Sequence, residues 1–168
     1  MSQNFWHWLK INFKVTSLLL FINVAIFLIT YIFSAFLFAG NDSVSLSLLG
    51  AQILPGSQYP FSDFIFQPWR FITSSFLHGG LIHLLFNMWA LNSLGFYLEK
   101  FYGGKKLFLI YIFTAITSAI ASFVVAFIGL VQNNSMAEGV IASVGASGAI
   151  FGFVGVLLGN KYLKNKTY

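Results

Sequence analysis

The sequence contains no cysteine, and charged residues are also scarce. Without cysteine the chain has no disulfide framework, no thiolate nucleophile and no cysteine-based metal site. Of its 168 residues, 8% are charged and 58% are hydrophobic. Soluble domains carry about 25% charged residues, so this chain has too little charge to cover itself with a water-facing surface. The composition therefore indicates an integral membrane protein.

Two further classes of protein are disfavoured by the way the charges are placed. The net charge of +5 comes from charges that are few and scattered, whereas a nucleic-acid footprint needs a clustered basic face. We therefore expect no nucleic-acid partner and take the lipid bilayer as the surroundings. A small channel or transporter has little support, because no paired ionisable residues line a pathway through the apolar segments.

Two segments are clear candidates for membrane-spanning helices. A spanning helix needs about 20 mostly apolar residues, and the segments Val15 to Ala39 and Leu107 to Val131 supply them. The first segment is too long for the core of a signal peptide, which covers about 7–15 residues. We therefore predict that both segments are retained as helices.

Two weaker segments carry more polar residues and are the more informative ones. Leu81 to Leu98 contains His83 and Asn87, and Val144 to Leu158 is rich in glycine. Polar residues inside a membrane cost free energy, so they mark functional sites by default. We predict that these segments form the second and fourth spans.

The distribution of charged residues supports four crossings. With four spans, all eight lysines fall on one side of the membrane, before the first span, between the second and third, and after the fourth. The other side holds Arg70, Asp42, Asp63 and Glu138. By the positive-inside rule, both termini face the cytoplasm, and we expect a multi-pass protein of a bacterial cytoplasmic membrane.

The longest connection, Gly40 to Gly80, faces outward in this topology. It holds all three prolines together with large apolar side chains such as Phe61, Phe64 and Trp69. Tryptophan prefers the membrane interface, so we expect this loop to lie partly in that interface. No internal repeat or linker interrupts the chain, which predicts a single domain over residues 1–168.

The first polar constellation consists of His78, His83 and Asn87. His83 and Asn87 are four residues apart, so on a helix they project from one face. Such side chains can hydrogen-bond to neighbouring helices as packing contacts, or they can donate hydrogen bonds to a developing oxyanion. No carboxylate or third histidine completes a metal site with them, and no cofactor is implied.

The second constellation is the sequence GASGAIFG, which runs from Gly145 to Gly152 around Ser147. Small neighbours let a substrate backbone approach the Ser147 hydroxyl and let the chain turn tightly. Gly148 and Gly152, with two further glycines at positions 155 and 159, form a stripe that allows close helix packing. Ser147 is offset by about 100° from Gly148 on an ideal helix. A structural role and a chemical role for Ser147 both stay open at this point.

Taken together, the two constellations resemble the rhomboid family of intramembrane serine proteases. The family pattern of Trp-Arg, a histidine, and then a histidine and asparagine four apart continues through further positions and the nucleophile motif GASGAIFG. In this chain the matching residues before that motif are Trp69, Arg70, His78, His83, Asn87, Met88, Gly95, Glu99 and Gly103. The match covers roughly Trp69 to Gly159.

The resemblance implies an all-α polytopic membrane protein, a rhomboid-like helical bundle with four of the usual six transmembrane helices present. It implies that Ser147 is the nucleophile and that His83 and Asn87, with the backbone N–H of Ser147, line the oxyanion hole. Arg70, His78 and Glu99 would be structural. The substrates would be other membrane proteins, cleaved in or near a transmembrane segment.

The resemblance also identifies a departure from the family pattern. Rhomboid proteases take their catalytic base from a histidine on the sixth transmembrane helix, whereas the histidines of this chain are His7, His78 and His83. A serine hydroxyl is a poor nucleophile until a base removes its proton. His7 would lie about 30 Å of hydrocarbon away from an outward-facing Ser147. We therefore expect a truncated rhomboid whose base histidine is absent and which is inactive as a protease.

A rival interpretation is a non-catalytic rhomboid-like protein that binds transmembrane clients. This interpretation accounts for the missing base without truncation. The intact set of Ser147, His83 and Asn87 argues against it, because a client-binding protein would not need these residues.

Overall fold

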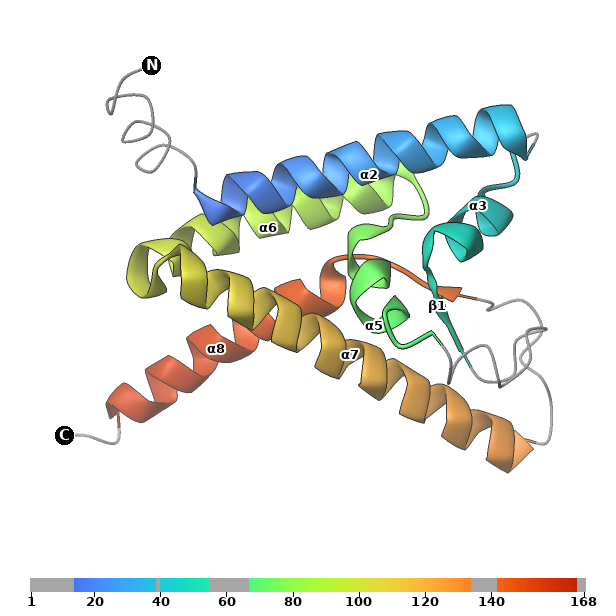
Figure 1. The fold of residues 1–168 in the computed structure, drawn as a ribbon. Coiled ribbons are helices and arrows are strands. Elements are labelled where there is room, and N and C mark those ends of the chain that lie inside the picture. Colours follow the sequence, from blue (N-terminus) through green and yellow to red (C-terminus); the bar gives the residue numbers. More distant parts are fainter. Residues whose placement is uncertain (1–13, 39, 55–66, 134–141, 166–168) are drawn as a thin grey trace, which may run out of the picture.

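The computed structural model describes residues 14–38, 40–54, 67–133 and 142–165, and in these ranges the chain is almost entirely helical (Figure 1). The long helices are α2 (Val15–Leu37), α6 (Leu81–Tyr102), α7 (Gly104–Asn133) and α8 (Ser147–Asn165). Helices α2 and α6, together with α7 over Gly104–Gly129, are long and apolar enough to cross a membrane. Helix α8 is apolar over a shorter stretch, Ser147–Asn160. The expected all-helical membrane fold is confirmed.

Several residues used in the sequence argument lie outside the described ranges. They are His7, Lys10, Ala39, Pro55, Pro60, Phe61, Asp63, Phe64, Glu138 and Lys166.

The connection between α2 and α6, predicted to be a loop, holds several short elements. They are α3 (Asp42–Leu49), strand β1 (Gln52–Ile53), α5 (Arg70–Thr73) and the 3₁₀ turn η1 (Ser74–Phe76). Strand β1 pairs antiparallel with β2 (Ala142–Ser143), so that Gln52 lies opposite Ser143. This short pairing ties the outer connection to the segment that leads into α8.

The start of α2 is joined to the end of α6 by one carboxylate. Glu99 accepts hydrogen bonds from the backbone N–H groups of Val15 and Thr16, at 2.7 and 3.0 Å, and from the Thr16 hydroxyl at 2.6 Å. The first N–H groups of a helix have no partner within the helix, and Glu99 satisfies two of them. Lys100 and Lys105 are exposed at the same end of the bundle, where α6 turns into α7 (Figure 1).

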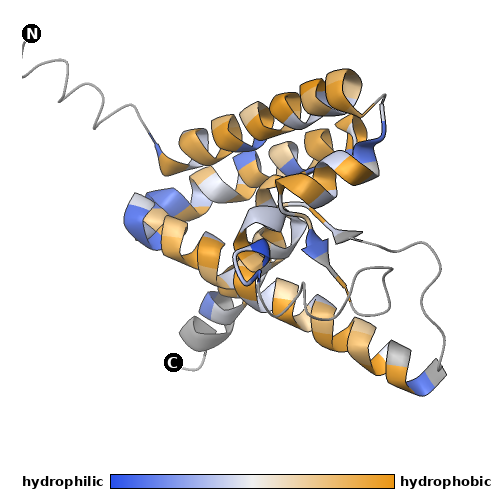
Figure 2. Ribbon diagram, turned by 45° about the vertical axis from the view of Figure 1, so that its right-hand side comes forward, coloured by the Kyte–Doolittle hydropathy of each residue, from blue (hydrophilic) through white to orange (hydrophobic). Residues whose placement is uncertain are grey.

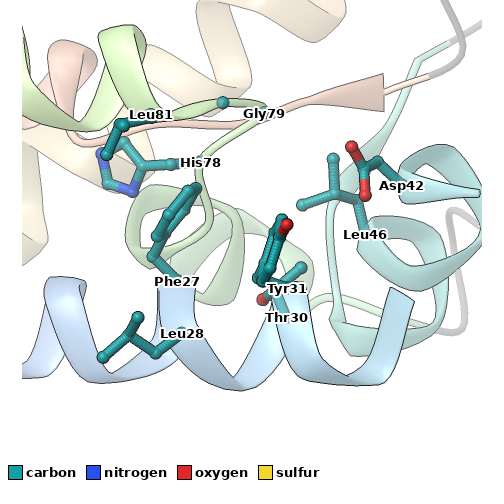
Figure 3. Close-up of a pocket in the computed structure, with 10 residues that line it drawn as sticks. Phe27, Leu28, Thr30, Tyr31, Asp42, Leu46, His78, Gly79 and Leu81 are labelled. Carbon is teal, nitrogen blue, oxygen red and sulfur yellow. The ribbon is translucent and has the colours of Figure 1, made fainter. Parts of the chain in front are cut away.

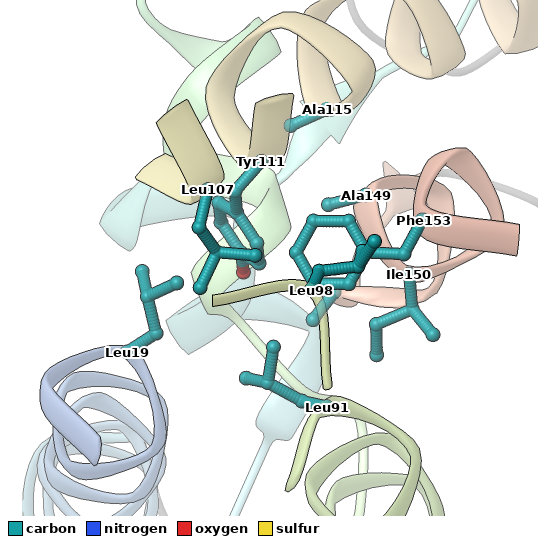
Figure 4. Packing of buried hydrophobic residues seen from close by; sticks show 10 residues of the cluster. Leu19, Leu91, Leu98, Leu107, Tyr111, Ala115, Ala149, Ile150 and Phe153 are labelled. Carbon is teal, nitrogen blue, oxygen red and sulfur yellow. The ribbon is translucent and has the colours of Figure 1, made fainter. Parts of the chain in front are cut away.

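Buried apolar side chains from all four long helices form the core shown in Figure 4. The members labelled there are Leu19, Leu91, Leu98, Leu107, Tyr111, Ala115, Ala149, Ile150 and Phe153. The Tyr111 hydroxyl donates a hydrogen bond to the carbonyl of Ser75 at 3.2 Å, which links the core to the η1 turn. Through this hydrogen bond the core holds the η1 turn, which precedes α6.

The outward faces of the helices are apolar as well, as the hydropathy colouring in Figure 2 shows. Phe36, Trp89 and Phe113 are among the large side chains that project outward. The polar Asn23 of α2 is turned inward instead, where its side-chain amide donates to the carbonyl of Leu19 at 2.8 Å. An apolar exterior with inward polar groups is the arrangement that a bilayer requires, and the protein is a multi-pass integral membrane protein.

The glycine stripe of α8 packs against α7 along half of its length. A β-carbon at Gly148 would overlap Ser118, and one at Gly152 would overlap Thr114. At Gly155 no described heavy atom would lie within 4 Å of such a carbon. The two N-terminal glycines therefore bring α7 and α8 into close contact, which positions the first turn of α8.

Candidate active site

Ser147 is the first residue of α8, and its position follows from the way that helix begins. The first helical hydrogen bond runs from the N–H of Ile150 to the carbonyl of Ala146 at 3.0 Å. The N–H groups of the first turn, including that of Ser147, have no partner within the helix, and the helix dipole gives this end a partial positive charge. The expected span started at Val144, three residues too early. Ser147 is therefore presented at a helix N-terminus.

Helix α8 starts late because the chain makes a turn at Gly145 with φ of 123°. The N–H of Gly145 donates to the carbonyl of Ser74 at 2.9 Å. A β-carbon on Gly145 would lie 2.7 Å from Nε2 of His83 and 3.4 Å from Nδ2 of Asn87. Glycine is needed here for its backbone conformation and for the approach of α6. His83 and Asn87 therefore lie against Gly145, two residues before Ser147.

Asn87 is buried, and its side-chain Nδ2 has no hydrogen-bond partner among the described residues. Leaving a buried donor unsatisfied costs about 1–3 kcal/mol, so such groups call for an explanation. A donor that faces the segment before a serine at a helix N-terminus is suited to receive a negatively charged oxygen. The unpaired side-chain amide of Asn87 is therefore available as a hydrogen-bond donor to a bound or reacting oxygen.

His78 precedes α6 in the sequence, lies next to His83 and is 2% exposed. The two imidazole rings pack edge to face with their centroids 5.2 Å apart. Burial, with a smaller contribution from the neighbouring His83, lowers the pKa of His78 to about 4. His78 is therefore neutral at pH 7 and supports the ring of His83 as a packing partner.

Ser147 also lines a small polar cavity of about 90 Å³. Its polar lining comes from Gln52, Ser74, Ser75, Ser118, Ser122, Ser143 and Ser147. A buried water needs about 10–15 Å³ of such volume and several polar partners, so the cavity has room for several waters. The cavity therefore offers a place for water next to Ser147 inside an otherwise apolar bundle.

The contribution of α7 to this cavity was not predicted from the sequence. Ser118 and Ser122 are four residues apart, so they lie on one face of the helix, and this spacing was the available signal. Gln52 reaches the same region from β1, where its amide donates to the carbonyl of Ala119 at 2.7 Å. No local pattern around Gln52 indicates this contact.

Arg70 and Glu99 lie apart from this cavity and make structural contacts. Nη1 of Arg70 donates to the carbonyls of Ser47 and Ala51, both at 2.7 Å, which holds the end of α3. Glu99 holds the start of α2, as described above. Within the described residues, no group of three histidine, aspartate or glutamate side chains is placed to hold a metal ion.

Residues 66–168 match the rhomboid domain family. This stretch is more than half of the chain, and the chain therefore belongs to the rhomboid family.

Three relatives illustrate the range of similarity. Rhomboid protease GluP of Bacillus subtilis (strain 168) is 43% identical over 90 residues, which are 54% of this chain and 15% of that protein. RHOMBOID-like protein 6, mitochondrial, of Arabidopsis thaliana is 33% identical over 125 residues, or 72% of this chain and 34% of that protein. Inactive RHOMBOID-like protein 8 of Arabidopsis thaliana is 34% identical over 90 residues, or 54% and 22%. The chain thus spans 15% to 34% of the length of these relatives.

Proposed function

We propose that this chain carries the nucleophile and the oxyanion-binding groups of an intramembrane serine endopeptidase that cleaves transmembrane segments of other membrane proteins. The observation that carries the proposal is the close approach of His83 and Asn87 to Gly145, directly before Ser147. Membership of the rhomboid family supports the same class of reaction.

In this mechanism the Ser147 hydroxyl oxygen attacks the scissile carbonyl carbon. The carbonyl oxygen then becomes negatively charged, and it accepts hydrogen bonds from the N–H of Ser147 and from the side chains of His83 and Asn87. Preorganised donors of this kind are usually the largest contribution to acyl-transfer catalysis. The N-terminus of α8 adds its partial positive charge.

The proton of Ser147 has to pass to a base and from that base to the leaving amine when the scissile C–N bond breaks. We propose that this base is a histidine outside residues 1–168. In this proposal His83, which lies against Gly145, serves the oxyanion, and His78 is a buried packing partner of His83. On α8, Phe151 and Leu158 lie on the face of Ser147 at spacings of four and eleven residues, and both are exposed. A further helix that bears the base would pack on this face.

The second half of the reaction needs water to hydrolyse the acyl-enzyme. The 90 Å³ cavity that Ser147 helps to line is a place for that water. We propose that the hydroxyls of Ser118 and Ser122 hold water there until the leaving fragment has departed.

The experiment compares the 168-residue chain with the same chain joined to a two-helix segment that carries the base histidine. We call the second protein the histidine-bearing protein. The first protein is expected to leave a transmembrane substrate intact and to resist a serine-directed fluorophosphonate. The second is expected to cleave and to be labelled. Ser147→Ala should abolish both activities in the second protein, whereas Ser93→Ala, which removes an exposed hydroxyl of α6, should change neither. Cleavage by the 168-residue chain that survives Ser147→Ala would refute this mechanism.

The role of Asn87 can be tested in the same histidine-bearing protein. Asn87→Ala is expected to lower the cleavage rate per folded protein by about 10²–10³, the usual effect of losing one oxyanion donor. A purely structural Asn87 would instead lower activity only in proportion to the loss of folded protein. Rate and folded fraction are therefore measured on the same samples.

A second candidate function is the binding of transmembrane clients without cleavage. It is favoured by one observation, the lack of a suitably placed base for Ser147 among the described residues. A client captured equally by wild-type chain and by Ser147→Ala, with no cleavage in the histidine-bearing protein, would support this function over the protease.

A further inference from the structure

A second and larger pocket, of about 450 Å³, lies where α2 ends and α6 begins. We call it the α2–α3 pocket. Its walls are Phe27, Leu28, Thr30 and Tyr31 of α2, Asp42 and Leu46 of α3, and His78, Gly79, Gly80 and Leu81 (Figure 3). It shares no lining residue with the cavity at Ser147. Its volume lies within the range of about 300–1,000 Å³ that is usual for ligand sites.

The rim of the α2–α3 pocket belongs to the apolar outer surface of the bundle. Leu28, Tyr31 and Leu81 line the pocket and are 54%, 63% and 57% exposed. Tyr31 is six residues before the end of α2 at Leu37, which corresponds to about 9 Å along the helix axis. Because α2 and α6 are membrane helices, the mouth of the pocket faces lipid near one surface of the bilayer.

The charge of the α2–α3 pocket is negative. Asp42 is the charged side chain among the described lining residues, and no described lysine or arginine lines the pocket. Its carboxylate accepts a hydrogen bond from the Ser34 hydroxyl at 2.5 Å. A carboxylate has about four acceptor sites, so Asp42 retains capacity for a cationic group. This charge attracts an ammonium group and repels a group with net negative charge.

The other side of the pocket carries an unsatisfied polar group. His78 is almost fully buried, and neither of its ring nitrogens has a hydrogen-bond partner among the described residues. A neutral imidazole offers one N–H donor, which a carbonyl oxygen would satisfy. Figure 3 shows His78 and Asp42 on opposite sides of the pocket, with the side chains of Phe27 and Tyr31 between them.

We propose that the α2–α3 pocket binds one phospholipid with an ammonium headgroup, of which phosphatidylethanolamine is the simplest. One acyl chain contacts Phe27 and Leu28, and the ammonium group pairs with Asp42. An ester carbonyl of the lipid accepts a hydrogen bond from His78. An apolar wall, one carboxylate and one unpaired donor match three parts of this lipid, namely an acyl chain, the ammonium group and an ester carbonyl.

The test measures lipid retention by native mass spectrometry of the 168-residue chain released from detergent micelles. The chain is first incubated with equal amounts of phosphatidylethanolamine and phosphatidylglycerol that have the same acyl chains. We expect one retained phosphatidylethanolamine per chain. Asp42→Asn keeps an acceptor for Ser34 but removes the charge. We expect it to lower lipid retention by about fivefold, which corresponds to the upper end of the free energies measured for exposed charge pairs.

A pair of matched tryptophan substitutions on α3 tests the place of binding. Leu46→Trp fills the pocket and should abolish retention of the lipid, whereas Leu48→Trp, at an exposed position two residues away, should leave retention unchanged. Equal retention in both variants, or a preference for phosphatidylglycerol, would overturn the proposal.

Two other occupants would give different results, and either would also overturn the proposal. A second copy of the chain in the pocket would appear as a dimer that Leu46→Trp dissociates and that retains no lipid. The chain's own residues 55–66 would be identified by a disulfide between Tyr31→Cys and a cysteine introduced in that segment, again without retained lipid.

Discussion

At the scale of single residues, Gly145 joins the two helices that carry the proposed chemistry. Its φ of 123° and its contact with His83 both depend on the lack of a side chain. We predict that Gly145→Ala, in the histidine-bearing protein, lowers the cleavage rate at least about tenfold and the free energy of unfolding by about 1–3 kcal/mol. Cleavage assays and thermal unfolding in detergent measure the two effects.

The matched control for that substitution is Gly129→Ala in α7. A β-carbon at Gly129 would meet no described heavy atom within 4 Å, and alanine favours a helix over glycine by about 1 kcal/mol. The control should therefore be neutral or slightly stabilising. Equal losses of activity in both variants would contradict the role given to Gly145.

His78 makes a prediction for the pH dependence of stability. Its pKa is about 4 in the folded protein, against 6.5 for an unperturbed histidine. Between these two values the unfolded chain binds a proton at His78 that the folded chain does not. The free energy of unfolding should therefore fall as the pH drops from about 6.5 to about 4, by at most about 3 kcal/mol, and this contribution should be constant above pH 6.5.

The measurement is unfolding in detergent across this pH range, for the wild type and for His78→Asn. Three other ionisable groups lie near His78. His83 on α6 packs against it, and Tyr31 on α2 and Asp42 on α3 line the same pocket. Both proteins share these groups, so the difference between the two curves isolates His78. Parallel curves would show that His78 has no such role.

At the scale of the helices, the close contact of α7 with α8 depends on part of the glycine stripe. Gly152→Val would place methyl groups against Thr114, and overpacking of this kind usually costs about 1–3 kcal/mol. Gly155→Val, one turn further on and open in the described structure, is the control and should cost much less. Thermal unfolding of both variants checks this, and equal destabilisation would argue against tight packing at Gly152.

The sequence predicted the helices and the candidate residues better than the segments between them. Long apolar runs report a membrane helix directly, and the motif around Ser147 identified the candidate nucleophile. The start of α8 was misjudged because hydropathy does not register the turn at Gly145. The pairing of Gln52 with Ser143 joins residues far apart in the sequence through two-residue strands, which are too short to give a periodic signal.

At the scale of the whole molecule, the predicted topology can be tested in this cysteine-free chain. Single cysteines at Ser43 and Gln132 should react with an impermeant thiol reagent from outside the cell. Cysteines at Lys105 and Lys164 should react only after the membrane is opened, because lysine-rich segments stay in the cytoplasm. Labelling of the Lys105 position from outside would refute four crossings with cytoplasmic termini.

The pairing of β1 with β2 also has a consequence for the order of assembly. During synthesis β1 emerges early, whereas β2 follows three of the four long helices. Contacts between distant parts of a chain form late, because the intervening loop must close first. The backbone edge at Gln52 therefore stays without its partner strand until the segment before α8 has been made. Ser147 is therefore brought to its place in the bundle only after α2, α6 and α7 have been made.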